Sequence, residues 1–419
     1  MRYNRRDFLS SMAGLAAMAA APSSAMAAAG TFQQAFDQPP AAARPWVRWW
    51  WPGGVVVDDE LRREIRALKL AGFGGAEIQA FNPAIPKLGK EERTRVNDYA
   101  NDAFWTHMKT CTDEAQAQGL RIDSTFGSAW PSGGGFAVTP ELALLELTPA
   151  FTSVRAPLDG PIRLKIPGNT RKFGALSALD ARTRDPRAKD WPERLAARQK
   201  LVAVVAFQGT APVLANTKNY RTATVQAPGS IDTPAGIVVT DKLGPDGVLD
   251  WVPPGDGDWQ IVVFKQFAVD SGVMGAVGEG PQLVLDHFNR GAFSAHARRV
   301  GAPLAPAGKP AAALRATFID SLELMPDIYW SEDLLAQFQT RRGYDLTPYL
   351  PHLMQPGWME SWNPHVSAPY FDGGEAGERI RADYRLTLSD LLIENLWQPF
   401  VAWNHANGLQ ARFQAHGAT

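Results

Sequence analysis

ALRATFIDSLELMPDIYW, residues 313–330, is the stretch that decides the fold class of this chain. It begins with an apolar, β-favouring run at residues 316–319 and continues at once into a polar cluster, Asp320, Ser321 and Glu323. A loop and a helical segment, FQTRRGY at residues 338–344, follow. Acidic groups at the C-terminal end of a buried strand, with a loop and a helix after them, are typical of a (β/α) barrel that carries its catalytic groups at its mouth.

Glu323 is the candidate catalytic residue of this stretch. Asp320 and Ser321 fit a simple turn equally well, because both residue types favour turns. Glu323 instead lies between Leu322 and Leu324, where a solvated loop would more often be polar. Apolar surroundings raise the pKa of a carboxyl group, and a raised pKa suits a general acid near neutral pH.

The length and composition of the chain limit the classes of protein to which it can belong. The chain has 419 residues, which is enough for one large barrel or for two to three domains. Its formal net charge of -1 gives no support to a nucleic-acid partner. The 14 tryptophans suit a cleft in which sugar rings lie on indoles, although most tryptophans in proteins are core residues.

Residues 1–29 have the pattern of a twin-arginine signal peptide. Arg5 and Arg6 precede an apolar stretch at residues 12–21, and Ala25-Met26-Ala27 offers a small-residue cleavage site. An amphipathic helix is the alternative, since the stretch is short for a membrane span. The pattern predicts recognition by the twin-arginine export machinery, a periplasmic or secreted location and no stable membrane anchor.

Residues 30–144 show the alternation of strands and helices that favours parallel βα units. Strands are expected at residues 45–51, 75–81 and 120–127, with helices after Asp58 and at about residues 102–118 between them. Strand alternation puts Trp49 and Trp51 on one face and Trp50 on the other. Cys111, the single cysteine, is expected to be buried on the second helix.

The pattern changes twice in the remaining sequence. Residues 145–269 are β-rich and predict a β-sandwich-like insertion, whereas residues 270–419 resume the βα pattern with expected strands at 281–289, 316–319 and 409–417. A helix is expected at about residues 377–405. This gives about five or six barrel strands, and a closed barrel has eight. The predicted fold class is therefore α/β, an incomplete (β/α)8 (TIM-like) barrel with a β-sandwich-like insertion, ending before the barrel closes.

Candidate ligand-binding residues are those that strand ends or indole rings would place at the barrel mouth. His287 and His296 lack the spacing of a metal-binding helical pair, and we expect structural histidines there. No metal ligand can be named from spacing. For the tryptophans, core packing is the alternative to a sugar platform. The substrate-binding candidates are Trp50, Glu77, Trp130, Asp286, Trp330, Arg412, Gln414 and His416.

Seven short segments follow one another in a characteristic order: WWWPG at residues 49–53, GGAEIQ at 74–79, WPSGG at 130–134, LDHF at 285–288, DSLE at 320–323, RRGYD at 341–345 and RFQAHG at 412–417. Taken together, they resemble the glycoside hydrolases of family 106, the α-L-rhamnosidase group. The resemblance covers nearly everything from Pro45 onward.

This resemblance implies a (β/α)8 catalytic barrel interrupted by β domains and inverting hydrolysis of terminal α-L-rhamnosyl groups. It also implies a calcium ion near the sugar. By motif match the general acid falls on Glu323, and the catalytic base falls in a segment that would follow His416 and Gly417, beyond the last residue of this chain.

Two functions from different classes follow. The first is a glycoside hydrolase that releases terminal α-L-rhamnose from polysaccharides or glycosides, with activity in doubt for a chain of this length. The alternative is a secreted carbohydrate-binding protein without catalysis, which would bind rhamnose and release no sugar.

Overall fold

The computed structural model describes residues 36–40, 43–82, 88–168, 185–215, 224–269, 272–278, 280–324, 326–355 and 368–414. The expected signal peptide and His416 lie outside these residues. Within the described part of the chain, no helix is both long and apolar enough to cross a membrane.

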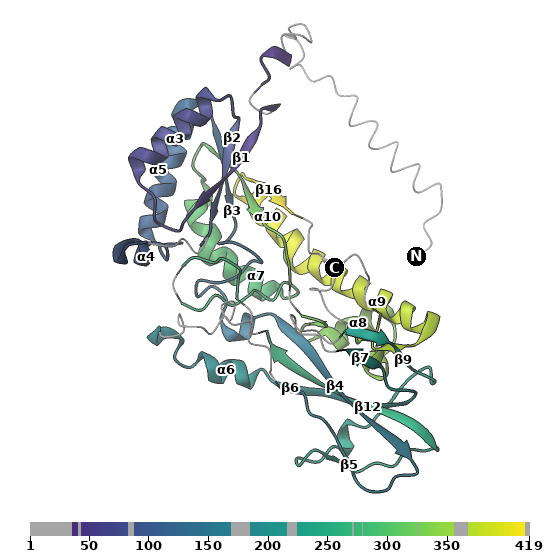
Figure 1. The fold of residues 1–419 in the computed structure, drawn as a ribbon. Helices are drawn as coiled ribbons and strands as arrows, with labels where there is room; N and C mark the ends of the chain where they lie inside the picture. The colour runs from purple at the N-terminus through teal and green to yellow at the C-terminus, as the bar shows by residue number, and fades with distance from the viewer. Residues whose placement is uncertain are drawn as a thin grey trace.

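Five parallel strands form a curled half-barrel (Figure 1). Its strand order is β1-β2-β3-β13-β16, so β3 pairs directly with β13 although a long segment separates them in the sequence. The described residues thus form a parallel sheet of the expected kind but not a closed barrel. The strands are β1 (Trp46–Trp51), β2 (Gly75–Ala80), β3 (Arg121–Thr125), β13 (Leu314–Ile319) and β16 (Gln410–Phe413).

Helices α3 (Asp58–Leu70) and α5 (Asp102–Gln118) lie side by side over the outer face of β1, β2 and β3 (Figure 1). Trp49 and Trp51 lie on the same face, as expected, and point toward this layer. The Trp51 ring meets the Phe104 ring of α5 edge-on, with the ring centroids 5.9 Å apart. Cys111 is fully buried there, as its sequence context predicts. Burial of these apolar side chains stabilises the outer layer and leaves the inner face of the sheet to polar residues.

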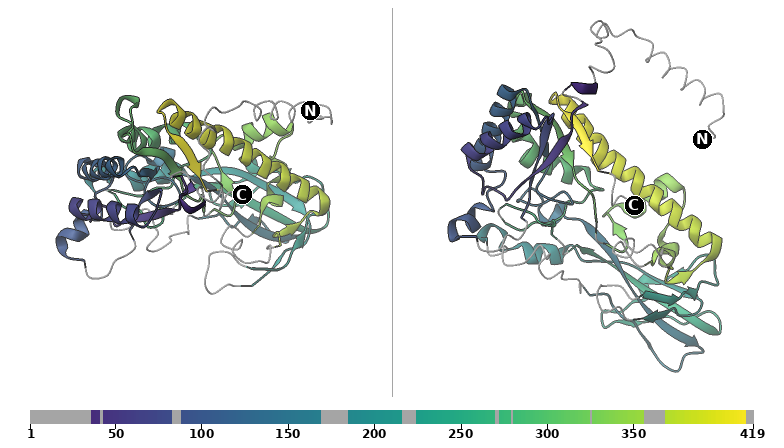
Figure 2. Two further views of the ribbon diagram at one scale, coloured as in Figure 1. Left: turned by 90° about the horizontal axis from the view of Figure 1, so that it is seen from above. Right: turned by 45° about the horizontal axis from the view of Figure 1, so that its top comes forward.

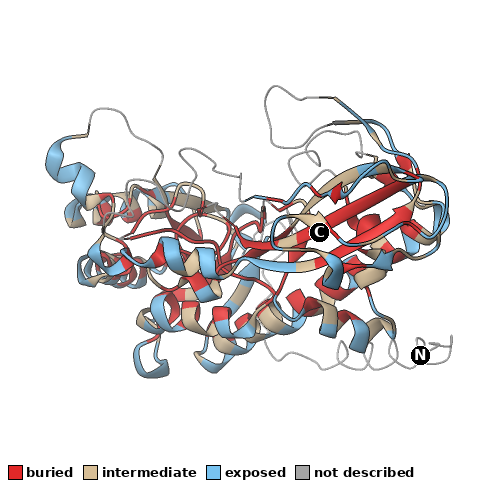
Figure 3. Ribbon diagram, turned by 90° about the horizontal axis from the view of Figure 1, so that it is seen from below, coloured by how far each residue is buried: buried red, intermediate tan, exposed pale blue. Residues whose placement is uncertain are grey.

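A second sheet is antiparallel and has the order β10-β6-β12-β4-β14. Its central strands are buried along most of their length (Figure 3). Successive residues of its strands point to opposite faces and belong to two buried clusters. Val205 and Phe264 belong to the main core, whereas Val204 and Val263 belong to a smaller core that includes residues of the strand pair β5–β11. The strands are β4 (Leu145–Ala156), β5 (Ile162–Arg163), β6 (Lys200–Gln208), β10 (Ile237–Val238), β11 (Val248–Leu249), β12 (Gly257–Ala268) and β14 (Tyr329–Trp330).

Helix α9 (Gly374–Leu392) continues through a π-helical turn at Ile393–Trp397 into α10 (Gln398–Ala406), which confirms the long helix expected there. It runs along the antiparallel sheet and ends beside β16 of the parallel sheet (Figures 1 and 2). The remaining α-helices and strand pairs are short: α4 (Lys90–Arg95), α6 (Trp191–Ala197), α7 (Arg290–His296), α8 (Leu334–Arg342), β7 (Val213–Ala215) with β8 (Thr224–Ala227), and β9 (Gly229–Ser230) with β15 (Phe371–Asp372).

The strand expected at residues 281–289 is not part of the parallel sheet. Its residues form only isolated antiparallel bridges, such as Val284 with Gly133 and Leu285 with Ala143. The physical reason is that β3 and β13 bond to each other, which leaves no place between them. The backbone groups of this segment bond instead to the glycine-rich loop, for example Leu285 N–H to the Ser132 carbonyl at 3.0 Å.

Candidate active site

The inner face of the half-barrel carries polar and aromatic side chains in cross-strand rows. Side chains of residues that are paired in register between neighbouring strands point to the same face. In one row Arg48 pairs with Glu77, and Glu77 pairs with Asp123. One step toward the C-terminal ends, Trp50 pairs with Gln79, and Phe318 pairs with both Thr125 and Arg412.

A network of ion pairs crosses the inner face and alternates in charge. Asp123 and Glu77 are buried, so each requires a cationic partner to offset the loss of hydration. Each carboxylate has two arginine partners that reach it from different strands. The distances are Arg48–Glu77 2.9 Å, Arg412–Glu77 2.7 Å, Arg412–Asp123 2.5 Å, Arg315–Asp123 2.6 Å and Arg48–Asp320 3.0 Å.

Glu323 is half-buried directly after this network, in the loop that follows β13. Its Oε1 accepts a hydrogen bond from the Ser321 hydroxyl at 2.7 Å, and its Oε2 accepts one from the Trp130 indole N–H at 3.0 Å. Leu322 and Leu324 are buried, so the expected apolar neighbours are present, but the carboxyl group itself has polar partners. The φ of Glu323 is 27°, a strained value of the kind that clusters at functional sites.

Three aromatic rings form a cluster that includes Trp130, the hydrogen-bond partner of Glu323. The Phe81 ring stacks on the Trp130 ring at 5.4 Å, and the Trp50 ring meets Phe81 at 5.2 Å and Trp130 at 6.4 Å. Trp50 is 47% exposed, which leaves ring surface available to a ligand. We call Trp50, Phe81 and Trp130 the aromatic cluster; such rings suit the C–H faces of a sugar.

Asp320 belongs to the ion-pair network through Arg48 and precedes Glu323 in the same loop. Burial is the largest effect on this residue and raises its pKa, although the bond from the Ser321 N–H and the charge of Arg48 act in the opposite direction. The negative charge of Glu323 raises the pKa of Asp320 further. Asp320 and Glu323 therefore lie close enough for their charges to interact.

The structure brings together five of the residues chosen from the sequence. Glu77 and Arg412 belong to the ion-pair network, and Trp50, Trp130 and Glu323 lie at the aromatic cluster. The backbone N–H of Gln414 donates to the Ile319 carbonyl at 3.1 Å, which extends the pairing of β16 with β13.

Two sequence candidates have other surroundings. Trp330 is 2% exposed, and its indole N–H donates to Gln266 within the antiparallel sheet, so it offers no ring face to a sugar. Asp286 is buried beside Arg198, Glu332 and Asp333, away from the parallel sheet, and burial raises its pKa to about 7. His287 and His296 are buried, and burial lowers the pKa of both, as expected of neutral structural histidines.

Three residues of the network were missed by sequence reasoning: Arg48, Asp123 and Arg315. The available signal was a charged residue inside an otherwise apolar strand, because such a charge is tolerated only with a partner. Arg315 also reaches the inner face because the register of β13 against β3 shifts between Leu314 and Ala316. That irregularity cannot be recognised from the sequence of one strand.

A calcium ion takes about six to eight oxygen ligands, usually from several carboxylates. Among the described residues no group of three or more acidic, histidine or cysteine side chains is placed to hold a metal ion. The carboxylates of the inner face already bind guanidinium groups. The described residues therefore do not fit the calcium ion that the family resemblance implies.

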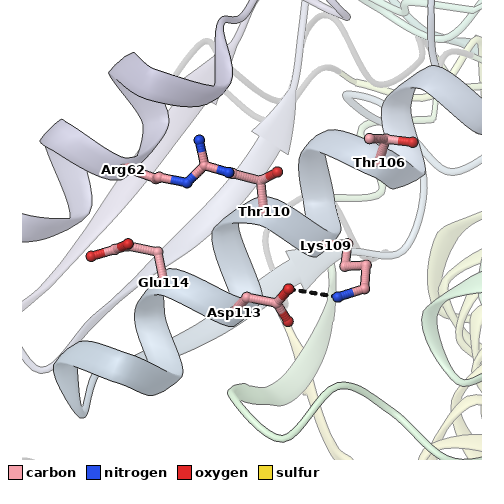
Figure 4. A pocket seen from close by; sticks show the side chains of 6 residues that line it. All are labelled: Arg62, Thr106, Lys109, Thr110, Asp113 and Glu114. Carbon is pink, nitrogen blue, oxygen red and sulfur yellow. Dashed lines mark hydrogen bonds and ion pairs between the residues drawn. The ribbon is translucent and has the colours of Figure 1, made fainter.

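A hollow of about 380 Å³ lies on the outer side of the sheet, between α3 and α5 (Figure 4). Its wall includes Arg62, Thr110 and the exposed pair Lys109–Asp113, with 2.5 Å between the charged atoms. None of the residues that line it is aromatic. The inner face remains the better candidate for a site.

Comparison with known proteins gives the class and then the family. The fold resembles that of a rhamnosidase from Novosphingobium sp. PP1Y, with a TM-score of 0.58 and 18% identity over 92% of this chain and 47% of that one. The chain is thus like a glycoside hydrolase in fold. It belongs to glycoside hydrolase family 106, described as alpha-L-rhamnosidase, whose sequence profile matches residues 178–419.

A curated relative differs in its assigned substrate. A protein from Formosa agariphila, provisionally assigned as a beta-glucuronidase, is 24% identical over 385 residues. The match covers 90% of this chain and 30% of that protein. This chain therefore spans less than half the length of each of these two proteins.

Proposed function

We propose that this chain contains the sugar-binding and general-acid part of an α-L-rhamnosidase that inverts configuration. The observation that carries the proposal is the position of Glu323, which is held by Ser321 and Trp130 beside the aromatic cluster. Membership of family 106 supports the choice of α-L-rhamnosides over other glycosides. Residues 1–29 support export through the twin-arginine machinery to the periplasm or the outside of the cell.

In this mechanism Glu323 protonates the glycosidic oxygen as the bond to the leaving group breaks. Its two donors, Ser321 and Trp130, hold the carboxyl group beside the aromatic cluster, where the rings would position the sugar. The rings of Trp50 and Trp130 would bind the apolar face of the sugar, including the methyl group of a 6-deoxy sugar.

An inverting mechanism also needs a carboxylate base about 6.5–9.5 Å from the acid, with a water molecule between base and sugar. Glu77 and Asp123 are unsuited to this role because guanidinium groups already occupy their oxygens. The base is therefore proposed to come from outside the described residues, as the family resemblance implies.

The test uses substitution of Glu323 by Gln and two substrates that differ in leaving group. Loss of a general acid should slow the hydrolysis of a rhamnosyl disaccharide by roughly 100- to 10,000-fold. A 2,4-dinitrophenyl α-L-rhamnoside should be hydrolysed at nearly the original rate, because its leaving group needs no proton. Glu394→Gln is the matched control, since Glu394 pairs with Arg341 on the exterior and should affect neither substrate. Equal slowing of both substrates by Glu323→Gln would contradict the acid role.

A carbohydrate-binding protein without catalysis is the second candidate. It is favoured by the pairing of the buried inner-face carboxylates with arginines, which leaves Glu77 and Asp123 unsuited to act as a base. It predicts quenching of tryptophan fluorescence by L-rhamnose with no sugar released from any rhamnoside.

A further inference from the structure

Gln79, in the middle of the inner face, has a buried side chain that the fold does not satisfy. It is 0% exposed, and neither its Oε1 nor its Nε2 has a hydrogen-bond partner in the described structure. Strand alternation places it on the same face as Glu77, and its register partner on β1 is Trp50. A buried amide without partners is costly, so such a group calls for an explanation.

Other buried glutamines show that this fold satisfies the same side chain elsewhere. Gln260, 1% exposed in β12, accepts from the Ser153 hydroxyl at 2.7 Å and donates to the Gly209 carbonyl at 3.0 Å. Gln266 accepts from Trp330 and donates to the Arg198 carbonyl, each at 3.0 Å. The unmet hydrogen-bonding capacity of Gln79 is therefore a property of its place on the inner face.

That place lies between the ion-pair network and the aromatic cluster. Glu77, two residues before Gln79, binds Arg48 and Arg412. Phe81, two residues after it, stacks on Trp130, whose indole donates to Glu323. Gln79 is thus flanked on its strand by Glu77 of the ion-pair network and by Phe81 of the aromatic cluster, and it pairs in register with Trp50.

We propose that Gln79 determines specificity by hydrogen bonding to two adjacent, unsubstituted hydroxyl groups of the bound sugar. This inference rests on the proposed function and names the part of the sugar that the site recognises. A primary amide offers a donor and an acceptor side by side, which complements a vicinal hydroxyl pair. A site built to bond a hydroxyl discriminates strongly against a sugar that lacks it, since the amide is then left unpaired. Rhamnosides with a methyl group on either hydroxyl are excluded for the same reason.

The experiment measures binding of methyl α-L-rhamnopyranoside and its 2-, 3- and 4-deoxy analogues by titration calorimetry. With the unsubstituted chain, at least one deoxy analogue should bind roughly 10- to 100-fold more weakly than the parent sugar. The Gln79→Leu variant should bind methyl α-L-rhamnopyranoside more weakly by a similar factor. It should bind that deoxy analogue as tightly as it binds methyl α-L-rhamnopyranoside. Gln260→Leu, the matched control, should keep the original pattern.

Thermal unfolding without sugar gives an independent readout. Gln79→Leu should keep or raise Tm because leucine removes an unpartnered amide, whereas Gln260→Leu should lower Tm because two hydrogen bonds are lost. A fall in Tm for Gln79→Leu equal to that of the control would overturn the assignment, since a buried water or the fold itself would then serve the amide. Gln79→Met provides a second apolar variant if the leucine variant does not fold.

The outcomes separate this inference from the function on which it rests. If the protein without a substitution bound all the deoxy analogues as tightly as the parent sugar, the role of Gln79 alone would be overturned. The same conclusion would follow if both Gln79 variants still distinguished the parent sugar from the analogues. Failure of the unsubstituted chain to bind any rhamnoside would overturn the proposed function and this role with it.

Discussion

At the scale of single residues, burial decides which groups carry charge. Asp286 is 2% exposed, and the only hydrogen bond described for its carboxyl group comes from the Phe288 N–H at 3.0 Å. Loss of hydration raises its pKa to about 7, and the charges of Asp333 and Glu332 act in the same direction. The neighbouring His287 behaves in the opposite sense, since burial lowers its pKa to about 3.

Asp286→Asn should stabilise the protein more as pH rises. Between the ordinary value of 3.8 and about pH 7, the folded state retains a proton on Asp286 that the unfolded state has released. Stability is therefore lost as pH increases through this window, by up to about 4 kcal/mol, and asparagine cannot ionise. The difference in Tm between variant and parent should be near zero at pH 4 and largest above pH 7.

The comparison with the variant is essential because His287 contributes the opposite slope. Its lowered pKa costs stability as pH falls from 6.5 toward about 3, so the two effects partly cancel in the parent protein. A difference in Tm between Asp286→Asn and the parent that stays constant from pH 4 to 8 would show that Asp286 is ionised in the fold.

At the scale of elements, Gly119 shows how a local signal fixes a boundary. It ends α5 in the left-handed conformation, with φ 67°, and its N–H bonds to the Gln116 carbonyl at 3.1 Å. The end of this helix was predictable because glycine adopts this conformation without steric cost. The turn then leads directly into β3, which carries Asp123 into the network.

Gly119→Ala should destabilise the protein by about 1–2 kcal/mol, because a side chain in the left-handed region is strained. The cost is conformational and not steric, since a Cβ would meet only the flexible end of Lys69, at 3.8 Å. Urea unfolding would measure it. Gly160→Ala is the control, for that glycine has no positive φ and no neighbour within 4 Å. Equal effects at the two positions would contradict the argument.

At the scale of the whole molecule, the two sheets share one core. Ile78 and Ile122 of the parallel sheet belong to the same buried cluster as Val205 and Phe264 of the antiparallel sheet. Helix α9 joins them further, because the Tyr384 hydroxyl donates to the Tyr329 carbonyl of β14 at 2.6 Å. A continuous core of this kind favours cooperative unfolding of both sheets together.

We therefore expect one thermal transition, with far-ultraviolet circular dichroism and tryptophan fluorescence changing at the same temperature. Tyr384→Phe should lower that temperature, because loss of the hydrogen bond lowers the free energy of unfolding by about 1 kcal/mol. The transition should remain single. Two separate transitions, or probes that do not coincide, would show that the sheets unfold independently.

The sequence by itself determined the elements and several of their faces. Local patterns predicted segments for all five parallel strands, and alternation separated Trp50 from Trp49 and Trp51. Glu323 was singled out by its position between two leucines after a strand, and the motifs of family 106 were recognisable. These features depend on neighbours a few residues apart, because backbone sterics and the periodicity of strands and helices act locally.

Only the tertiary structure decided which strands pair and therefore which side chains meet. The Trp130–Glu323 bond joins residues 193 positions apart, Arg48–Asp320 spans 272 positions, and Arg412–Glu77 spans 335. The segment at residues 281–289 looked like a strand of the sheet, yet the pairing of β3 with β13 displaced it. Pairing is a competition among all strands for the same backbone hydrogen bonds, and no single segment encodes its outcome.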